Sequence, residues 1–277
     1  MIIDTHAHVW SEEHSRSEGA AGKTSKYPTV EELSRNMNEA GVDKAVIVRP
    51  TGEVRGNEYV AECLRRFPGK FAAIALVDAK SPDAPDELER LVREQGFGGT
   101  RLFPSREADL SVLAARAQDP LWRRAEELGV CFIVLVSAED LSALEPIIER
   151  FPNVKVVIDH LGRVPVDEAP PQPLLGNLLR LARFPAVYVK VSAIGDRSKS
   201  PYPHKDTFST ISRIHDAFGP QRLMWGTNYP GGARANGYAA ILELVRTHMD
   251  FLTEEDKEWL LSKTAMSMWR FDGGAAR

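Results

Sequence analysis

The sequence is poor in cysteine and has no long apolar segment. Cys63 and Cys131 are its two cysteines, too few for a disulfide framework, and both are expected to be buried thiols in a reducing cytoplasm. The first residues, Met-Ile-Ile-Asp-Thr-His, lack the basic and apolar regions of a signal peptide. No stretch approaches the ~18 uninterrupted apolar residues of a membrane-spanning helix. These absences predict a cytoplasmic protein that does not enter a membrane.

The chain also lacks a strong excess of either charge. It carries 35 basic and 39 acidic side chains among 277 residues, a formal net charge of −4. Nothing in this balance would attract the phosphate backbone of a nucleic acid. Linker-like and low-complexity segments are absent as well, so residues 1–277 are expected to form one domain. A chain of this length matches the roughly 250 residues of an eight-stranded α/β barrel.

Eight short runs rich in apolar and β-branched residues alternate with longer helical patterns. Continuous apolar runs are typical of parallel strands that are buried on both faces. Eight strand–helix units favour a closed TIM (β/α)8 barrel over an open sheet. The expected strands are Ile2–Val9, Lys44–Arg49, Phe71–Val77, Gly99–Phe103, Cys131–Val136, Lys155–His160, Val187–Val191 and Leu223–Gly226.

Several of the intervening helices have recognisable ends. Thr29 and Glu32 have the spacing of a capping box, and Gly41 can end the helix that they begin. The helix predicted over Pro82–Gln95 is acidic at its start and stops before a glycine. Asp109–Leu128 is expected to form one long helix or two helices divided at Pro120. Further helices are expected over Glu139–Arg150, Leu174–Arg183, Asp206–Phe218, Asn236–Asp250 and Glu254–Lys263.

Three longer segments follow strands and therefore lie on the carboxyl-terminal face of the predicted barrel. They are Ser11–Pro28, Val164–Pro173 and Gly195–Lys205, the last of which contains Tyr202. Barrel enzymes keep their active sites on this face. These loops, and Tyr202 within them, are therefore expected to contact the substrate and set its identity.

The first predicted strand ends in Asp4-Thr5-His6-Ala7-His8. Because side chains alternate along a strand, Asp4, His6 and His8 are expected to point together into the mouth of the barrel, with the residues between them facing the helices. Two imidazoles on one strand face suit metal ligation or the stabilisation of charge. The alternative is a pair of histidines satisfied by neighbouring hydrogen bonds.

The sixth and eighth predicted strands end in further polar residues. His160 follows an apolar run and is expected inside the barrel, with Asp159 on the opposite face as an orienting or structural carboxylate; a capping role is the alternative for His160. After the eighth strand, Gly226 allows close packing and Pro230 ends the strand. Asn228 is then expected to project into the mouth beside the histidines of the first strand.

Together these motifs resemble the amidohydrolase superfamily, and within it the branch of 2-pyrone-4,6-dicarboxylate lactonase and the sugar lactonases. The resemblance extends over nearly the whole chain. The motifs that carry it are Asp4-Thr5-His6-Ala7-His8, Gly99-Thr100-Arg101-Leu102, Ile158-Asp159-His160-Leu161-Gly162-Arg163, Tyr188-Val189-Lys190-Val191-Ser192 and Trp225-Gly226-Thr227-Asn228-Tyr229-Pro230.

The resemblance implies that water opens a lactone or a related carbonyl compound. His6, His8 and His160 would polarise the carbonyl. They would do so either as shared ligands of one divalent metal ion (Zn or Mn) or without a metal. Arg101 and Arg163 resemble arginines that hold substrate carboxylates, which a guanidinium binds bidentately; the alternatives are an ion pair inside the barrel for Arg101 and a surface charge for Arg163.

Further polar contacts with the substrate are expected from Lys190 and Ser192, which share a face of the seventh strand. The resemblance therefore implies a small anionic substrate. The sequence is compatible with a homo-oligomer but does not determine the oligomeric state.

Two positions depart from the family pattern. Many metal-dependent members carry a histidine or a modified lysine on a middle strand, whereas the fifth strand here ends in Val134-Leu135-Val136-Ser137, so tight zinc binding is disfavoured. Asn228 stands where the resemblance implies an aspartate that takes a proton from water, and an amide cannot accept that proton.

Three explanations for Asn228 stay open at this point. The asparagine is an engineered change that traps substrate, or another group is the base or none is needed, or the site binds without turnover. Two functions compete with the lactonase. The superfamily resemblance also implies a metal-dependent decarboxylase of an aromatic or muconate-type acid, which ranks lower because the extra metal ligand on a middle strand is missing, and Asn228 favours a binding protein that has lost catalysis.

Overall fold

Eight parallel strands form the centre of the structure, a computed structural model that describes residues 1–17, 27–103, 115–166 and 172–271. Each strand pairs with its neighbours in sequence order, and all eight predicted strands are present with most ends one to three residues shorter. The strands are β1 (Ile3–Ala7), β2 (Lys44–Val48), β3 (Phe71–Ile74), β4 (Gly99–Leu102), β5 (Cys131–Val134), β6 (Val156–Ile158), β7 (Val187–Val191) and β8 (Leu223–Trp225).

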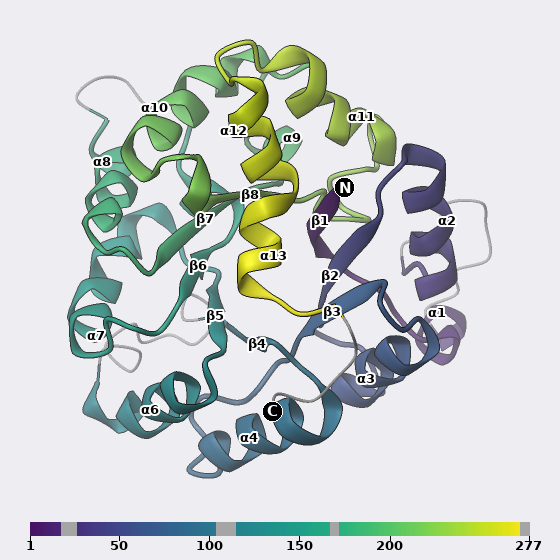
Figure 1. Cartoon of the computed structure of the whole chain (residues 1–277), viewed down its shortest axis with the longest axis vertical. Coiled ribbons are helices and arrows are strands. Elements are labelled where there is room, and N and C mark those ends of the chain that lie inside the picture. The colour runs from purple at the N-terminus through teal and green to yellow at the C-terminus, as the bar shows by residue number, and fades with distance from the viewer. Residues whose placement is uncertain (18–26, 104–114, 167–171, 272–277) are drawn as a thin grey trace.

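The barrel is closed but distorted. Strands β1–β3 and strands β4–β8 form two continuous ladders. Single bridges join them, one between Ala75 and Thr100 and one between Ala7 and Tyr229. At the second junction the backbone N–H of His8 donates to the carbonyl of Tyr229 at 2.8 Å. Figure 1 shows the strands at the centre with helices around them, as expected for a TIM barrel.

The helices surround the barrel and confirm several of the expected ends. Thr29 and Glu32 form the predicted capping box, and Gly41 and Gly96 end their helices in left-handed conformations. The described α-helices are α1 (Glu12–Ser17), α2 (Val30–Ala40), α3 (Gly56–Arg66), α4 (Ala84–Gln95), α6 (Asp119–Leu128), α7 (Glu145–Arg150), α8 (Pro173–Arg180), α9 (Ile194–Arg197), α10 (Phe208–Phe218), α11 (Tyr238–Glu243), α12 (Glu254–Glu258) and α13 (Thr264–Met268).

The helix predictions fail in two ways. Helix α3 was not predicted, because it begins at Gly56 after Arg55, which makes no side-chain cap; the chain offers no start signal there. Several predicted helices are also interrupted by tighter or wider turns. A 3-10 turn at Arg116–Gln118 precedes α6. Pro120 lies in the first turn of α6, the position at which proline is best tolerated in a helix. Residues 109–114 of that prediction lie outside the described part.

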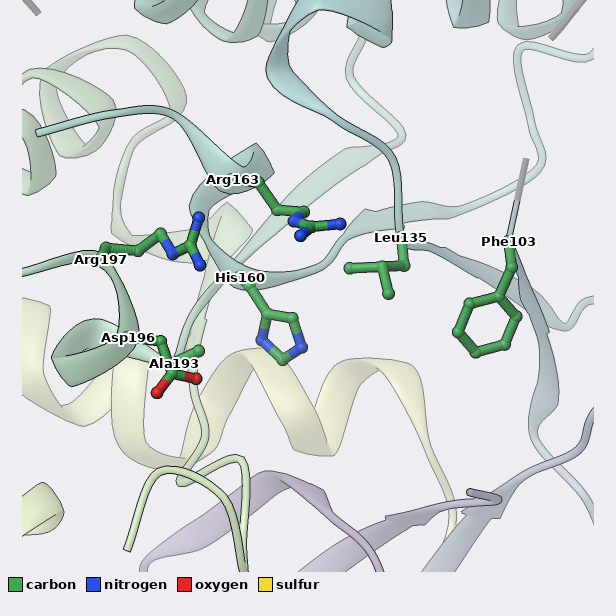
Figure 2. A pocket seen from close by; sticks show the side chains of 7 residues that line it. All are labelled: Phe103, Leu135, His160, Arg163, Ala193, Asp196 and Arg197. Carbon is green, nitrogen blue, oxygen red and sulfur yellow. The ribbon is translucent and has the colours of Figure 1, made fainter. Parts of the chain in front are cut away.

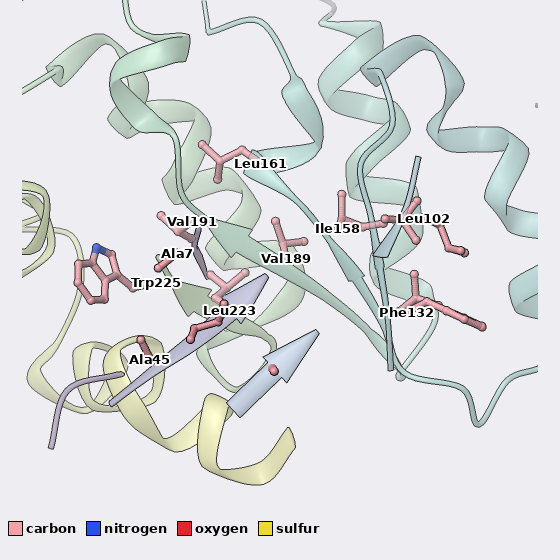
Figure 3. Close-up of a cluster of buried hydrophobic side chains, with 14 of the residues drawn as sticks. Ala7, Ala45, Leu102, Phe132, Ile158, Leu161, Val189, Val191, Leu223 and Trp225 are labelled. Carbon is pink, nitrogen blue, oxygen red and sulfur yellow. The ribbon is translucent and has the colours of Figure 1, made fainter. Parts of the chain in front are cut away.

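Two apolar clusters hold the barrel together. The larger one packs the outer faces of the strands against the helices and includes Phe132, Ile158, Val189 and Trp225 (Figure 3). The smaller cluster fills the barrel around the amino ends of the strands and contains Ile3, Val46, Ile74, Ile133 and Met224. Both clusters are buried, so the open end of the barrel is left at the carboxyl ends of the strands.

The last helix closes the amino-terminal end of the barrel. Helix α13 crosses the centre of the barrel in Figure 1, and Ala265, Trp269 and Phe271 pack into the inner cluster. Trp269 is only 3% exposed. The carboxyl-terminal segment is therefore part of the core. All described helices are too short or too polar to cross a membrane.

We expect Trp269→Ala to destabilise the fold by about 3–5 kcal/mol, because it leaves a cavity under the barrel. Met266→Ala is the matched control, since Met266 lies on α13, three residues before Trp269, but is 46% exposed, and its truncation should change stability by less than about 0.5 kcal/mol. Urea denaturation of the two variants measures both values. Equal decreases in the free energy of unfolding of the two variants would contradict the conclusion that Trp269 closes the amino-terminal end of the barrel.

Candidate active site

Strand β1 brings two histidines to the open end of the barrel, but it does not alternate regularly. Its pairing with β2 shifts register between Asp4 and Ala7, as a β-bulge does. Ile3 consequently packs inside the barrel, while Asp4 contacts Tyr238 of α11, outside the barrel. The expectation that Asp4 shares a face with His6 and His8 is therefore wrong, because the irregularity breaks the period of two.

Asp4 instead anchors the turn after β8. Its carboxylate accepts hydrogen bonds from the backbone N–H of Thr227 at 2.9 Å, from the Thr227 hydroxyl at 2.5 Å and from the Tyr238 hydroxyl at 2.8 Å. Burial raises the pKa of Asp4, and the hydrogen bonds from Thr227 and Tyr238 oppose that rise. A Cβ on Gly226 would lie 2.9 Å from the Cβ of His6, so glycine is needed for β1 and β8 to approach this closely.

The centre of the site is a buried carboxylate between two cations. Asp159 accepts from Nε of Arg101 at 2.8 Å and lies 2.7 Å from its Nη2 and 3.4 Å from Nζ of Lys190. All three side chains are buried. Burial alone would raise the pKa of Asp159, but Arg101 and Lys190 hold it well below the usual range. Asp159 is therefore a carboxylate whose charge is neutralised inside the protein.

Asp159 orients His6. Nδ1 of His6 lies 3.1 Å from Oδ1 of Asp159 and 3.1 Å from Nζ of Lys190. Lys190 has only donors, so it donates to Nδ1 in the His6 tautomer that has a lone pair there, whereas in the other tautomer the Nδ1–H of His6 donates to Asp159. The tautomer that donates to Asp159 leaves the Nε2 of His6 with its lone pair.

The orienting role expected for Asp159 is consistent with this geometry, but its expected position is wrong. Asp159 and His160 were placed on opposite faces, whereas both contact the site. Strand β6 ends at Ile158, and His160 has a left-handed backbone with φ 53°, so alternation no longer applies. The sequence carried a usable signal, because a carboxylate directly after an apolar strand must find buried cationic partners.

His8 is oriented by the backbone. Its Nδ1 lies 2.7 Å from the carbonyl oxygen of Val48, so Nδ1 carries the proton and Nε2 keeps its lone pair. Desolvation, with Arg101 nearby, lowers the pKa of His8 to about 4. The pKa of His6 is also lowered well below its usual value, mainly by burial. Both imidazoles are therefore neutral at pH 7.

The two strand β1 histidines face each other with their Nε2 atoms 3.2 Å apart. This distance fits an N–H···N hydrogen bond if one of the two nitrogens carries a proton, and a shared cation if both have lone pairs. Two nitrogens bound at 2.0–2.1 Å to a tetrahedral zinc ion are separated by roughly 3.3 Å. The pair therefore fits two ligands of one divalent ion, and this fit contrasts with the poor zinc site expected from the middle strands.

His160 lies beside this pair. Its ring centroid is 4.5 Å from that of His6. Its Nδ1 is 2.9 Å from Oγ of Ser192 and its Nε2 is 3.5 Å from Nη2 of Arg101. Desolvation lowers the pKa of His160 to about 3, so it is neutral as well. Ligand atoms of His6, Asp159 and His160 lie within 4.8 Å of one another, which puts His160 within reach of an ion held at His6.

A pocket of about 250 Å³ opens at His160. It is lined by Phe103, Leu135, His160, Arg163, Ala193, Asp196 and Arg197. In Figure 2, Arg163 and Arg197 extend toward the space above His160, Phe103 and Leu135 lie on one side of it, and Asp196 lies on the other. Among the described residues, no carboxylate is within ion-pair distance of Arg163 or Arg197. The pocket therefore combines two unpaired cations with a neutral imidazole.

The structure brings most of the predicted site residues together, although not all in the expected roles. Arg101 was expected to bind substrate, but it is paired with Asp159 and 5% exposed. Lys190 is fully buried and also paired with Asp159. Ser192 contacts His160 rather than the open pocket. Tyr202 donates to the carbonyl of Ala240 at 3.3 Å and packs against His248, so it is not in the pocket wall.

Asn228 lies at the mouth of the barrel, but its side chain turns away from the histidines. Its Nδ2 donates to Oδ2 of Asp196 at 3.3 Å, and its backbone is left-handed with φ 55°. Asp196 and Arg197 were not identified in the sequence, because the helix α9 that carries them has only four residues and so shows no periodicity that indicates which side chain faces inward.

Two relatives of this chain are named as enzymes that open lactones. The chain is 25% identical over 242 residues to an L-fucono-1,5-lactonase from Burkholderia ambifaria, covering 82% of this chain and 80% of the lactonase. It is also 25% identical over 239 residues to a 4-sulfomuconolactone hydrolase from Hydrogenophaga intermedia, covering 82% and 74%.

Two solved structures share the fold. A Pseudomonas putida protein described as a candidate 2-pyrone-4,6-dicarboxylic acid hydrolase superposes with a TM-score of 0.81 at 22% identity, over 96% of both chains. A zinc-bound amidohydrolase from Burkholderia multivorans superposes with a TM-score of 0.79 at 21% identity, over 97% of this chain and 98% of the other.

The family model described as amidohydrolase matches residues 3–271. This match begins at β1 and ends at the segment that closes the barrel, and it includes every residue of the site. The chain belongs to the amidohydrolase family.

Proposed function

We propose that this protein is a lactonase that opens a cyclic ester carrying a carboxylate or a similar anionic group. The observation that carries the proposal is the pocket of about 250 Å³ in which the guanidinium groups of Arg163 and Arg197, which pair with no carboxylate in the described part of the chain, lie beside neutral His160. Its size suits a monocyclic substrate. The lactone-opening relatives and the family membership give the reaction class.

Different residues of the site would bind the anionic group of the substrate and polarise its ester carbonyl. Arg163 and Arg197 would hold the anionic group of the substrate through charge-assisted hydrogen bonds. This places the ester carbonyl toward His160 and the histidine pair of β1. As water adds to the carbonyl carbon, negative charge develops on the carbonyl oxygen, and fixed positive groups stabilise it more strongly than water would.

His6 and His8 are the residues that would hold a divalent metal ion, zinc or manganese, with His160 beside them. Such an ion would polarise the carbonyl and acidify a bound water. Asp159 would keep His6 in the ligating tautomer by accepting from its Nδ1–H, and the Val48 carbonyl does the same for His8. Asp159 itself is occupied by Arg101 and Lys190 and contributes orientation rather than ligation.

Three expectations from the sequence stay predictions. They are a single domain over residues 1–277, a cytoplasmic location, and a small-molecule partner with no nucleic acid. Assembly into a homo-oligomer is a further prediction of this kind.

We expect hydrolysis of lactones that bear a carboxylate or sulfonate to exceed that of neutral sugar lactones. Arg163→Gln and Arg197→Gln should each raise KM for the anionic lactones about 10- to 100-fold, the effect of losing one charge-assisted hydrogen bond, and should change KM for neutral lactones far less. Arg93→Gln is the control, because Arg93 is exposed on α4 and pairs with Glu89. Initial rates on a lactone panel, with products identified by NMR, measure these effects.

Each other outcome of this panel selects another function. Release of carbon dioxide from aromatic acids would point to a decarboxylase. Tight binding without product would point to a binding protein. Equal effects of the arginine variants on anionic and neutral lactones would refute the anionic specificity.

Protein purified without chelator is expected to contain about one equivalent of zinc or manganese per chain. His8→Ala should lose this metal, because it removes one of the two facing Nε2 atoms, while His248→Ala, a histidine outside the site, should retain it. Elemental analysis of the three proteins measures the content. Full activity without metal would instead mean that one of the two facing nitrogens carries a proton.

The neutral histidines predict a loss of stability in acid. His160 has a pKa of about 3 in the folded state against 6.5 for an ordinary histidine, so the unfolded chain binds more protons between these values and stability falls as the pH drops below about 6.5. Thermal melting in chelator from pH 8 to pH 5 should show a falling Tm. His160→Gln should flatten part of this slope and His248→Gln should not; identical slopes would contradict the assignment.

A further inference from the structure

Water cannot open a lactone efficiently unless some group accepts its proton. Among the described residues, the pocket is lined by a single carboxylate, that of Asp196. The buried carboxylates nearby are already engaged. Asp159 lies between Arg101 and Lys190, and Asp4 accepts hydrogen bonds from Thr227 and Tyr238.

The histidines are engaged too. Nδ1 of His8 donates to the Val48 carbonyl and its Nε2 faces His6. Both ring nitrogens of His160 have partners, Ser192 and Arg101. Asn228 is an amide and has no basic atom. Elimination within the described part of the chain therefore leaves Asp196.

The position of Asp196 suits a base. Its Oδ2 accepts from Nδ2 of Asn228 at 3.3 Å, and no described residue donates to its Oδ1. One oxygen thus orients the carboxylate while the other stays available for a water molecule. An aspartate at position 228 would instead bring two negative charges together, so the amide of Asn228 is the complement that this carboxylate requires.

The backbone holds Asp196 at the pocket. Ala193, three residues earlier, has a left-handed backbone with φ 55°, an uncommon conformation for a residue with a Cβ. It turns the chain from β7 into the short helix α9, which carries Asp196. A Cβ on Gly195 would lie 3.2 Å from Nε2 of His204, so glycine lets His204 pack beneath this turn.

The rest of the loop is braced by a second carboxylate. Asp206 accepts from the hydroxyl of Ser198 at 2.6 Å and from the backbone N–H of Lys199 at 2.7 Å. These contacts tie the segment after α9 to the start of α10. Asp196 therefore lies on a supported turn, and it does not share the bracing role of Asp206.

We propose that Asp196 is the general base of this enzyme, a role that rests on the lactonase function proposed above. The Asp196 carboxylate takes one proton from water as the water oxygen bonds to the lactone carbonyl carbon, and the carbonyl π electrons move onto the oxygen. When the intermediate collapses, the C–O bond of the ring breaks, its electron pair stays on the ring oxygen, and that oxygen takes the proton back from Asp196. The product is a hydroxy acid, and Asp196 ends as it began.

The experiment compares wild type, Asp196→Ala and the control Asp206→Asn on the best lactone of the panel. Asp196→Ala should lose about 10²- to 10⁴-fold in kcat with a much smaller change in KM. Sodium formate, a small carboxylate that can enter the vacated space, should restore part of the kcat of Asp196→Ala. Asp206→Asn perturbs the loop without removing the base, so formate should not change its rate.

Exchanging the aspartate and the asparagine of the hydrogen-bonded pair Asp196–Asn228 gives a second test. Asp196→Asn should be as impaired as Asp196→Ala, and adding Asn228→Asp to it should restore activity, because the double variant has the same pair with the ends exchanged. Asn228→Asp alone should give no gain, since two carboxylates then compete for one site.

Three results would overturn the assignment. They are a kcat of Asp196→Ala close to that of wild type, no response of that variant to formate, and a several-hundred-fold gain in Asn228→Asp alone. If wild type opens lactones and Asp196→Ala does so equally well, only the base is wrong. If wild type opens none of the panel, the proposed function fails and the role of Asp196 falls with it.

Discussion

The site depends on one buried ionic cluster, in which Asp159 binds Arg101, Lys190 and His6. Taking these charges out of water is unfavourable unless each has a partner, and removing one partner from such a cluster typically costs about 3–5 kcal/mol. The cluster therefore fixes the carboxyl ends of β4, β6 and β7 relative to β1. It also contains the two groups, Asp159 and Lys190, that compete for Nδ1 of His6, so the interaction that holds the barrel mouth together also contacts the metal-ligating histidine of the proposed site.

Around this cluster the backbone leaves regular geometry wherever a strand becomes a loop. His160, Arg163, Ala193 and Asn228 all have φ between 53° and 55°. Such conformations are unfavourable for residues other than glycine and persist where the surroundings enforce them. Here they turn the chain where it leaves β6, β7 and β8. The barrel supplies rigid strand ends, and the turns after β6 and β7 bring His160, Arg163 and Ala193 into one pocket.

These turns also explain what the sequence could and could not predict. The strands were predictable because their side chains face two apolar environments, and His6, His8 and His160 were identifiable as polar residues at the ends of apolar runs. The period of two then failed at the irregular end of β1, which misplaced Asp4. It failed again after Ile158, where the expected opposition of Asp159 and His160 was wrong.

The residues that the sequence did not reveal are those that act through partners distant along the chain. Arg197 and Asp196 lie on α9, after β7. Arg197 shares the pocket with Arg163, and Asp196 accepts a hydrogen bond from Asn228, and these two partners follow other strands. Arg101 was predicted as a substrate ligand because it resembles an arginine of the lactonase branch, with an ion pair inside the barrel as the alternative. Its pairing with Asp159 depends on how β4 and β6 are placed on either side of β5. Sequence spacing carries no information on such contacts.

The charges of the described site explain why an anion would enter it. Arg101, Lys190, Arg163 and Arg197 are opposed by Asp159 and Asp196, and the three histidines are neutral. Asp159 offsets one of the two inner cations, and Asp196 offsets one of the two guanidinium charges at the opening, so the described site keeps a net positive charge on a chain whose overall charge is −4. This local positive charge attracts an anionic substrate. The deeper histidines stay uncharged.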